Sequence, residues 1–369
     1  MRVAPVLVLC LLGGIVGLVA QPPGKTLDIY FIDTEGGQST LYVGPSGESL
    51  LVDTGNAGDR DLARILEALK AAGVGRIDHL WSTHYHGDHI GALLAVAKQM
   101  PIGQFYDHGS PHPNDRIVSA PFLKSYEDLS RGKRTIVKPG DKLRMAGLDV
   151  TAVASANRYL RTNLRGGGRP NAACAETQQK DESSYIDTDN GDSAGFLMTY
   201  GRFRTINLGD LTWNGELDLM CPTNRVGTVD VYLTSHHGLE RSGSPALVHA
   251  LQPRVAVMNN GMRKGGSADA FRVLHASPWL EDLWQLHWSH NAGLDNAPSL
   301  FVANIDDAAT LAGVLTAPAG PGGRGGGPAA GAAAAHTPAH LIAISAQADG
   351  TFTVTNTRNS FRKTYRPRD

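Results

Sequence analysis

Residues 83–89 read Thr-His-Tyr-His-Gly-Asp-His, and this short stretch decides how the rest of the chain is interpreted. It directly follows an apolar segment, residues 77–82, whose composition is typical of a strand. Imidazole and carboxylate groups are the preferred ligands of zinc and similar divalent ions. Four such side chains fall within six positions: His84, His86, Asp88 and His89. This density argues against chance clustering in a solvated loop, and the absence of neighbouring cysteines argues against a structural zinc site.

The spacing of these four side chains predicts that they converge. His84 and His86 alternate at a strand end, so they can share one face. Gly87 permits a sharp bend, after which Asp88 and His89 approach the same point from the next turn. Two pairs of ligands at this spacing suit two ions a few ångströms apart. We therefore expect one or two Zn²⁺ ions at this turn.

Strand and helix patterns alternate on both sides of the turn. Strands are predicted at 27–32, 39–43, 50–52, 77–82, 148–154, 195–200, 204–208, 229–234 and 254–258. Helices are predicted from about residue 59 to 73, at 90–99 and at 245–251. Polar residues follow several strand ends: Asp53, Asp210, His236 with His237, and Asn259. This plan favours a β-sandwich flanked by helices, with its chemistry at one edge of a sheet.

The pattern His-x-His-x-Asp-His at 84–89 resembles the signature of the metallo-β-lactamase superfamily. Asp53 in Leu-Val-Asp-Thr-Gly, Asp210 in Leu-Gly-Asp-Leu and the run 235–238, Ser-His-His-Gly, resemble the other motifs of that superfamily in order and spacing. The likeness covers about residues 27–261. It implies an α/β fold, the four-layer αββα sandwich.

The resemblance also implies roles for the residues in these motifs. Asp53 would support the metal site without binding metal, and Asp210 would bridge both ions. Strand alternation lets only one histidine of the pair 236–237 point inward. His237 precedes glycine, as in the family pattern, so His237 is the expected ligand. His236 would then support the site or face the substrate.

The subgroup that these motifs resemble most is the soluble hydrolase domain of ComEC/Rec2-like competence proteins. Residues 31–33, 37–40, 192–193 and 234–238 carry this likeness. The sequence lacks the multi-helix channel of those proteins, so no multi-span membrane domain is expected. A stand-alone relative of the hydrolase domain is the resulting interpretation.

One position departs from the superfamily pattern. A histidine usually follows the strand at 150–154, but this chain has Ser-Ala-Asn at 155–157. Asn157, His108 or His112 could complete the first metal site. Otherwise water completes it, beside His84, His86 and Asp210. The gap weakens the case for two tightly bound zinc ions and makes Mn²⁺ an alternative.

The expected reaction is hydrolysis by a metal-activated water that Asp88 or Asp210 orients. Arg158 and Arg161, together with Arg165 and Arg169, lie beside the vacant ligand position. Guanidinium groups match phosphate oxygens, although a solvated charged loop is an equal alternative. We therefore expect a phosphodiester or nucleic-acid-like substrate. A lactonase or β-lactamase and a non-catalytic metal-binding module remain the competing hypotheses, and no stable protein partner can be inferred.

The composition and the two ends of the chain complete the prediction. The formal net charge of -1 over 369 residues excludes an overall positive charge that would attract nucleic acid. Residues 1–20 resemble a signal peptide, which predicts export, with an uncleaved membrane anchor as the alternative. Residues 25–315 would form the hydrolase domain, 316–340 a Gly/Ala/Pro-rich flexible loop, and 341–369 a hairpin and basic tail.

For two further pairs of residues the sequence predicts no functional role. In an oxidising compartment Cys174 and Cys221 could pair, but the sequence does not show whether they are close enough. His287 and His290, near two tryptophans, are expected to pack at a surface edge.

Overall fold

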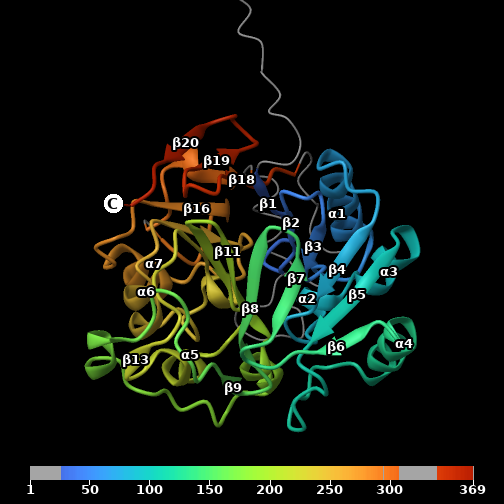
Figure 1. The fold of residues 1–369 in the computed structure, drawn as a ribbon, viewed down its shortest axis with the longest axis horizontal. Coiled ribbons are helices and arrows are strands. Elements are labelled where there is room, and N and C mark those ends of the chain that lie inside the picture. Colours follow the sequence, from blue (N-terminus) through green and yellow to red (C-terminus); the bar gives the residue numbers. More distant parts are fainter. Residues whose placement is uncertain (1–25, 294, 307–338, 369) are drawn as a thin grey trace, which may run out of the picture.

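The computed structural model describes residues 26–293, 295–306 and 339–368. The expected signal peptide at 1–20 and nearly all of the Gly/Ala/Pro-rich stretch lie outside these residues. Two large β-sheets face each other, with α1, α3 and α4 on one outer side and α5, α6 and α7 on the other (Figure 1). This arrangement confirms the predicted αββα sandwich.

The first sheet has nine strands in the order β20-β19-β18-β1-β2-β3-β4-β5-β6. Strands β3 to β6 run parallel to one another, whereas the other neighbours are antiparallel. Their bounds are β1 Leu27–Phe31, β2 Thr40–Val43, β3 Ser49–Val52, β4 Ile77–Trp81, β5 Ile102–Asp107, β6 Arg134–Ile136, β18 Ile342–Ala346, β19 Phe352–Asn356 and β20 Arg362–Tyr365. The predicted C-terminal hairpin is thus part of this sheet, because β18 pairs with β1.

The second sheet has the order β17-β16-β15-β14-β12-β11-β8-β7, with β9 paired to β8. Strands β12, β14, β15, β16 and β17 run parallel. Their bounds are β7 Lys142–Met145, β8 Leu148–Ser155, β9 Arg158–Tyr159, β11 Gly195–Tyr200, β12 Phe203–Asn207, β14 Val231–Leu233, β15 Val255–Met258, β16 Asp282–His287 and β17 Val302–Asn304. A small separate sheet pairs β10 (Arg169–Pro170) with β13 (Thr223–Asn224).

Three apolar cores hold the layers together. One lies between the two sheets and includes Trp81 and Phe196, and each of the other two lies between a sheet and its helices. The α-helices are α1 Asp59–Ala71, α2 Gly87–Ile90, α3 Leu93–Gln99, α4 Ala120–Ser130, α5 Trp213–Met220, α6 Pro245–Leu251 and α7 Ala268–His275. Short 3-10 helices are η1 Ala172–Ala175, η2 Thr188–Asp192, η3 Ser235–Gly238 and η4 Ser299–Phe301. No helix among the described residues is both long enough and apolar enough to cross a membrane.

The helix predicted at 90–99 is two helices in the structure. Gly91 separates α2 from α3, and its backbone nitrogen donates to Gly55 O at 2.8 Å. A Cβ at position 91 would lie 2.2 Å from Ala57 N, so only glycine permits this close approach. Because α2 begins at Gly87, Asp88 and His89 lie in its first turn.

The two sheets are joined directly beside the histidine turn. Trp81 Nε1 donates to Ala194 O at 2.8 Å, and Ala194 N donates to Thr83 O at the same distance. Parallel strands present their carboxyl ends at one edge of a sheet. The residues that follow β3, β4, β12, β14 and β15 therefore meet at one end of the sandwich.

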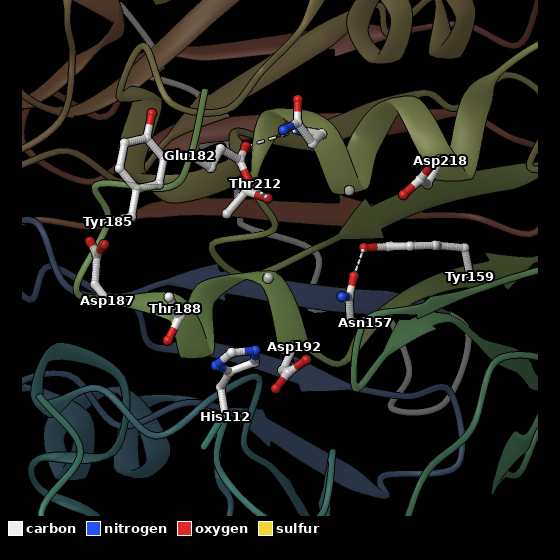
Figure 2. Close-up of a pocket in the computed structure, with 13 residues that line it drawn as sticks. His112, Asn157, Tyr159, Glu182, Tyr185, Asp187, Thr188, Asp192, Thr212 and Asp218 are labelled. Atoms are coloured by element: carbon white, nitrogen blue, oxygen red, sulfur yellow. Dashed lines mark hydrogen bonds between the residues drawn. The ribbon is translucent and has the colours of Figure 1, made fainter. Parts of the chain in front are cut away.

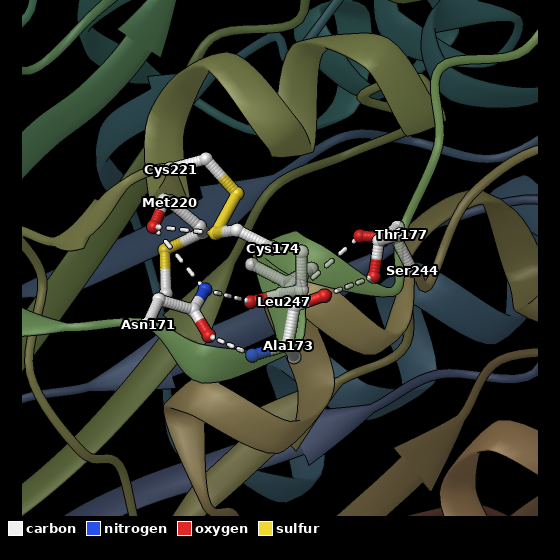
Figure 3. Close-up of a disulfide and its surroundings, with 9 residues drawn as sticks. Asn171, Ala173, Cys174, Thr177, Met220, Cys221, Ser244 and Leu247 are labelled. Atoms are coloured by element: carbon white, nitrogen blue, oxygen red, sulfur yellow. Dashed lines mark hydrogen bonds between the residues drawn. A yellow bond between two sulfur atoms is a disulfide. The ribbon is translucent and has the colours of Figure 1, made fainter.

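A disulfide joins Cys174 in η1 to Cys221, the residue after α5, with a Cα–Cα distance of 5.8 Å (Figure 3). This settles the pairing that the sequence leaves open. Asn171 supports the bridge, because its Nδ2 donates to Met220 O at 3.2 Å and to Ala246 O at 2.7 Å. The segment around η1 is thus tied to both α5 and α6.

Candidate metal centre

Four side chains from three separate segments form the main cluster. They are Asp88 and His89 of α2, Asp210 after β12, and His237 of η3, and their ligand atoms all lie within 4.8 Å of one another. His89 Nε2 lies 3.2 Å and His237 Nε2 3.3 Å from Asp210 Oδ2. His237 Nε2 also lies 3.2 Å from Asp88 Oδ2. Only Asp88 of the four is partly exposed, at 18%.

A second pair of donors adjoins this cluster. His84 Nε2 and His86 Nδ1 are 3.0 Å apart, and His84 Nε2 lies 4.0 Å from Asp210 Oδ2. Asp210 therefore lies between the two sets of donors, as the resemblance implies for a bridging carboxylate. Its Oδ1 is buried and has no hydrogen-bond partner among the described residues. An orphaned carboxylate oxygen surrounded by imidazole nitrogens fits divalent cations, so the residues present suit the expected metal.

A glycine allows Asp210 to come this close to the histidine turn. Gly209 has φ +57, and a Cβ there would lie 2.7 Å from Thr83 Cβ. Any larger residue at 209 would push the loop after β12 away from residues 83–89. The position of Asp210 thus depends on the close approach of Gly209 to the side chain of Thr83.

Asp53 lies behind the cluster and connects its parts. Its Oδ2 lies 2.8 Å from His89 Nδ1, so His89 Nε2 faces Asp210. It also accepts from Thr83 N and Thr83 Oγ1, at 2.8 and 2.7 Å, and from Gln38 Nε2 at 2.8 Å. A carboxylate that orients a ligating imidazole fixes its tautomer and raises its basicity. The structure thus places Asp53 where it supports the site.

Asp115 does for His86 what Asp53 does for His89. His86 Nε2 lies 3.0 Å from Asp115 Oδ2, which leaves His86 Nδ1 beside His84. Asp115 also accepts from Asp189 N at 2.8 Å. Sequence reasoning missed Asp115, because it belongs to a loop after β5 that carries no recognisable motif.

We predict that Asp115→Asn weakens divalent metal binding at the His84–His86 pair by about 10- to 100-fold, the usual effect of removing a carboxylate behind a metal ligand. The asparagine keeps one acceptor oxygen for the loop but loses the charge that orients His86. Competition with a chromogenic chelator measures the affinity. Asp128→Asn on α4 is the matched control, because Asp128 is exposed. Unchanged affinity for both ions in Asp115→Asn would contradict this role.

The prediction that only one histidine of the pair 236–237 points inward is wrong. Both residues have left-handed backbones, with φ 54 and 57, so they do not alternate as in a strand. His236 Nε2 consequently lies 3.5 Å from Asp210 Oδ2, close to the His237 distance. His236 Nδ1 lies 3.3 Å from Ser242 Oγ, and Asn259 Nδ2 lies 3.2 Å from His237 Nδ1. Both imidazoles are held facing Asp210.

The structure places the candidate substitutes for the missing histidine elsewhere. Asn157 Oδ1 accepts from Tyr159 OH at 2.6 Å. His108 Nε2 lies 3.3 Å from Asp189 Oδ2, and His112 N donates to Asp189 Oδ1 at 2.7 Å. His236 approaches Asp210 Oδ2 to 3.5 Å, whereas the contacts of the three residues expected from the sequence are with Tyr159 and Asp189.

The arginines expected to bind phosphate do not converge on the metal centre. Arg158 and Arg161 are exposed on and just after β9. Arg165 Nη2 donates to Gly201 O, which lies in the turn before β12, at the opposite end of that strand from Asp210. A role for Arg158 and Arg161 in substrate binding stays a prediction.

The electrostatics of the cluster favour a bound cation. Burial alone would raise the pKa values of Asp88 and Asp210, but neighbouring cations and imidazoles hold both well below their usual range. For Asp88 the largest of these lowering effects comes from Lys264, whose Nζ contacts its carboxylate. Burial would lower the pKa of His89, yet Asp210 and Asp88 raise it well above its ordinary value. The buried Asp210 and the partly exposed Asp88 thus place two negative charges at this point, which a divalent ion can balance.

His287 is not at a surface edge as expected. Its side chain is fully buried, and its Nε2 lies 2.5 Å from Asp33 Oδ1. Asp33 also accepts from Arg64 at 2.8 Å. This buried ion cluster joins β16 to the loop after β1 and to α1. His290 is exposed, as expected.

Comparisons with known proteins agree with the geometry. Residues 33–141 match the model of the metallo-beta-lactamase superfamily. The chain is 27% identical to competence protein ComA of Neisseria gonorrhoeae over 222 residues, which is 60% of this chain and 25% of that protein. It is 31% identical to an atrochrysone carboxyl ACP thioesterase of a Cryptosporiopsis species over 96 residues, 26% of this chain and 27% of that one. The chain thus spans about a quarter of each relative.

One solved structure that is similar to this chain is the metallo-beta-lactamase fold protein YhfI from Bacillus subtilis. It shares 10% identity and a TM-score of 0.43 over 70% of this chain and 95% of that one. A likeness of this size adds nothing to what the sequence match shows.

Proposed function

We propose that this chain, which carries a metallo-β-lactamase superfamily domain, is an exported, metal-dependent hydrolase of phosphodiester or nucleic-acid-like substrates. The observation that carries the proposal is the convergence of two distant segments, residues 84–89 and 236–237, on Asp210 Oδ2. His89 and His237 lie within 3.3 Å of this oxygen, and His236 lies within 3.5 Å. Members of the superfamily are generally hydrolases or related enzymes.

The donors divide into two sets that share Asp210. His84 and His86 would hold one divalent ion, whereas Asp88, His89 and His237 would hold the other. Zn²⁺ suits this mixture of imidazole and carboxylate, and Mn²⁺ suits its carboxylates. A bound divalent ion lowers the pKa of water toward neutrality and stabilises negative charge on the attacked group. Asp88 and Asp210 orient the water, while Asp53 and Asp115 hold the imidazole rings.

Two observations support an anionic, phosphodiester-like reacting group. Lys264 contacts the partly exposed Asp88 and so places a positive charge at the accessible side of the metal centre. The likeness to competence protein ComA, together with the ComEC/Rec2-like motifs, favours the same class. The choice of a phosphodiester substrate rests on Lys264 and on the likeness to ComA, because the arginines after β8 do not converge on the metal centre.

The test is a metal-dependent assay on the purified chain. We expect hydrolysis of bis-p-nitrophenyl phosphate with Zn²⁺ or Mn²⁺, loss of this activity after chelation, and recovery when metal is returned. A lactone, a thioester and a cephalosporin chromogen measured in parallel separate the phosphodiesterase from other hydrolases of this fold. Bound metal without turnover on any of the four would overturn the proposal in favour of a non-catalytic metal-binding module.

Export is supported by the disulfide between Cys174 and Cys221, because disulfides persist mainly in oxidising compartments. The signal-peptide prediction for residues 1–20 agrees with this. Fractionation of expressing cells tests the proposal, with the full chain expected outside the cytoplasm. Recovery of the chain in the cytoplasm with both cysteines reduced would contradict it.

A further inference from the structure

A cavity of about 270 Å³ lies between the loop that carries η2 and the start of α5 (Figure 2). Four carboxylates line it, from Glu182, Asp187, Asp192 and Asp218, and the side chains of Tyr159 and Tyr185 lie among them. Among the thirteen described residues that line it there is neither lysine nor arginine. The cavity is thus acidic and partly aromatic.

The acidic pocket adjoins the metal centre through three of its walls. Thr212 of the pocket follows Asp210 by two residues. Ser193, next to Asp192, accepts from Asp210 N through its Oγ at 3.2 Å. On the third side, Asp189 accepts from His112 N of the pocket and donates its own N–H to Asp115, which holds His86. The walls of the acidic pocket are therefore linked to the metal ligands through neighbouring residues and hydrogen bonds, although no metal ligand itself lines the pocket.

Two of the four carboxylates already have partners. Asp187 pairs with Arg241 at 2.5 and 2.8 Å. Glu182 accepts from Thr212 Oγ1 and Asn214 N, both at 3.1 Å, at the N-terminus of α5. These two carboxylates therefore shape the walls of the pocket and need no ligand.

Asp192 is different, because its carboxylate faces the pocket, and its titratable neighbours His108 and Asp189 lie within 4.8 Å of it without forming a hydrogen bond to it. Its side chain lines the pocket, the residue is 7% exposed, and no donor among the described residues forms a hydrogen bond with its carboxylate. Burial raises the pKa of Asp192, the neighbouring His108 opposes this effect, and the negative charge of Asp189 adds to it. A carboxylate that is largely withdrawn from water and lies beside a second carboxylate is costly, and a cation in the pocket would lower this cost.

We propose that the acidic pocket receives an ammonium group of the substrate, so that the substrate is a phosphodiester with a cationic substituent, of the choline or ethanolamine kind. This inference rests on the proposed hydrolase function and specifies its substrate class. The cavity is far larger than a bare metal ion but suits a small organic cation. The ring of Tyr185 already holds the Arg241 guanidinium at 3.6 Å, so the carboxylates and the ring of Tyr159 would surround the bound cation.

The two charged regions then divide the substrate between them. The anionic phosphate lies at the metal ligands beside Lys264, and the ammonium group lies near Asp192. Hydrolysis forms a bond from phosphorus to the water oxygen and breaks the bond from phosphorus to one ester oxygen. The released alcohol keeps the electron pair and takes up a proton, and the other product is a phosphomonoester.

The test compares p-nitrophenyl phosphocholine with its neutral 3,3-dimethylbutyl isostere on the metal-loaded protein. We expect kcat/KM to be at least about tenfold higher for the choline ester, mainly through a lower KM. Asp192→Asn is expected to reduce this ratio toward one, whereas Asp128→Asn, the exposed control on α4, keeps it. Equal kcat/KM values in the wild-type protein would overturn the inference and leave the proposed function standing.

A second measurement distinguishes failure of this inference from failure of the proposed function. Choline binding to the metal-loaded protein, followed by calorimetry with 3,3-dimethylbutanol as the neutral control, reports on the pocket without any turnover. We expect choline to bind more tightly than the alcohol. Choline binding without cleavage of any phosphodiester would overturn the proposed function, whereas failure of choline to bind would overturn the inference. Neither result depends on whether Asp192→Asn folds.

Discussion

Asp210→Asn is expected to lower the rate of hydrolysis by more than about 100-fold. Even the removal of a carboxylate that lies behind a metal ligand typically lowers metal affinity or activity by up to that factor. Asp210 is the one carboxylate that both donor sets approach: His84 from one side, and His89 with His237 from the other. Asparagine keeps the shape but loses the charge. The variant should therefore lose metal as well as turnover.

Metal content and kcat/KM measured on the same preparation check this prediction. The fold should survive, because Asp210 lies in a loop and its carboxylate contacts the ligand imidazoles. Thermal unfolding of the metal-free variant against the metal-free parent tests that part. Asp128→Asn serves again as the control with normal metal content. Wild-type metal content and turnover in Asp210→Asn would show that Asp210 is not part of the metal centre.

Removing the disulfide should have the largest effect on stability. Cys174 and Cys221 are 47 residues apart, and cross-linking a loop of that length stabilises the native state by about 4 kcal/mol in the chain-entropy model. The double variant Cys174→Ser, Cys221→Ser should therefore unfold at a clearly lower denaturant concentration. Metal binding should persist under native conditions, since no metal ligand lies in η1 or at Cys221.

The measurement is the free energy of unfolding with and without reductant. Reduction should destabilise the parent by about the same amount as the double substitution, and it should leave the double variant unchanged. A parent that is insensitive to reductant would show that the bridge contributes little. A double variant that responds to reductant would point to an effect unrelated to this pair.

The sequence predicted the fold and the central ligands because their signals are local. The turn at 84–89 carries four donors within six residues, and the strand periodicity around it fixes the two sheets. The strand at 195–200 is found as predicted, and the C-terminal hairpin signal gave β18 and β19 correctly. Asp53 and Asp210 were identifiable because the short motifs that contain them, after predicted strands, resemble those of the metallo-β-lactamase superfamily.

Other parts of the site depend on long-range packing that no local pattern encodes. Asp115 and Lys264 reach the metal ligands from loops 29 and 176 residues away from their partners. The inward position of His236 depends on left-handed backbones in η3, where a strand-based expectation gives the wrong direction. His287 was misjudged because its partner Asp33 lies 254 residues earlier. The acidic pocket likewise exists only after distant segments meet.

The pairing of β18 with β1 closes the first sheet with strands from opposite ends of the domain. A truncated chain that stopped before residue 339 would lose three strands and leave β1, with its buried Leu27, Ile29 and Phe31, as a bare edge. Such an edge invites pairing with another molecule. Expression boundaries that omit residues 339–368 would therefore expose this edge to aggregation, so these residues belong in any recombinant version of this protein.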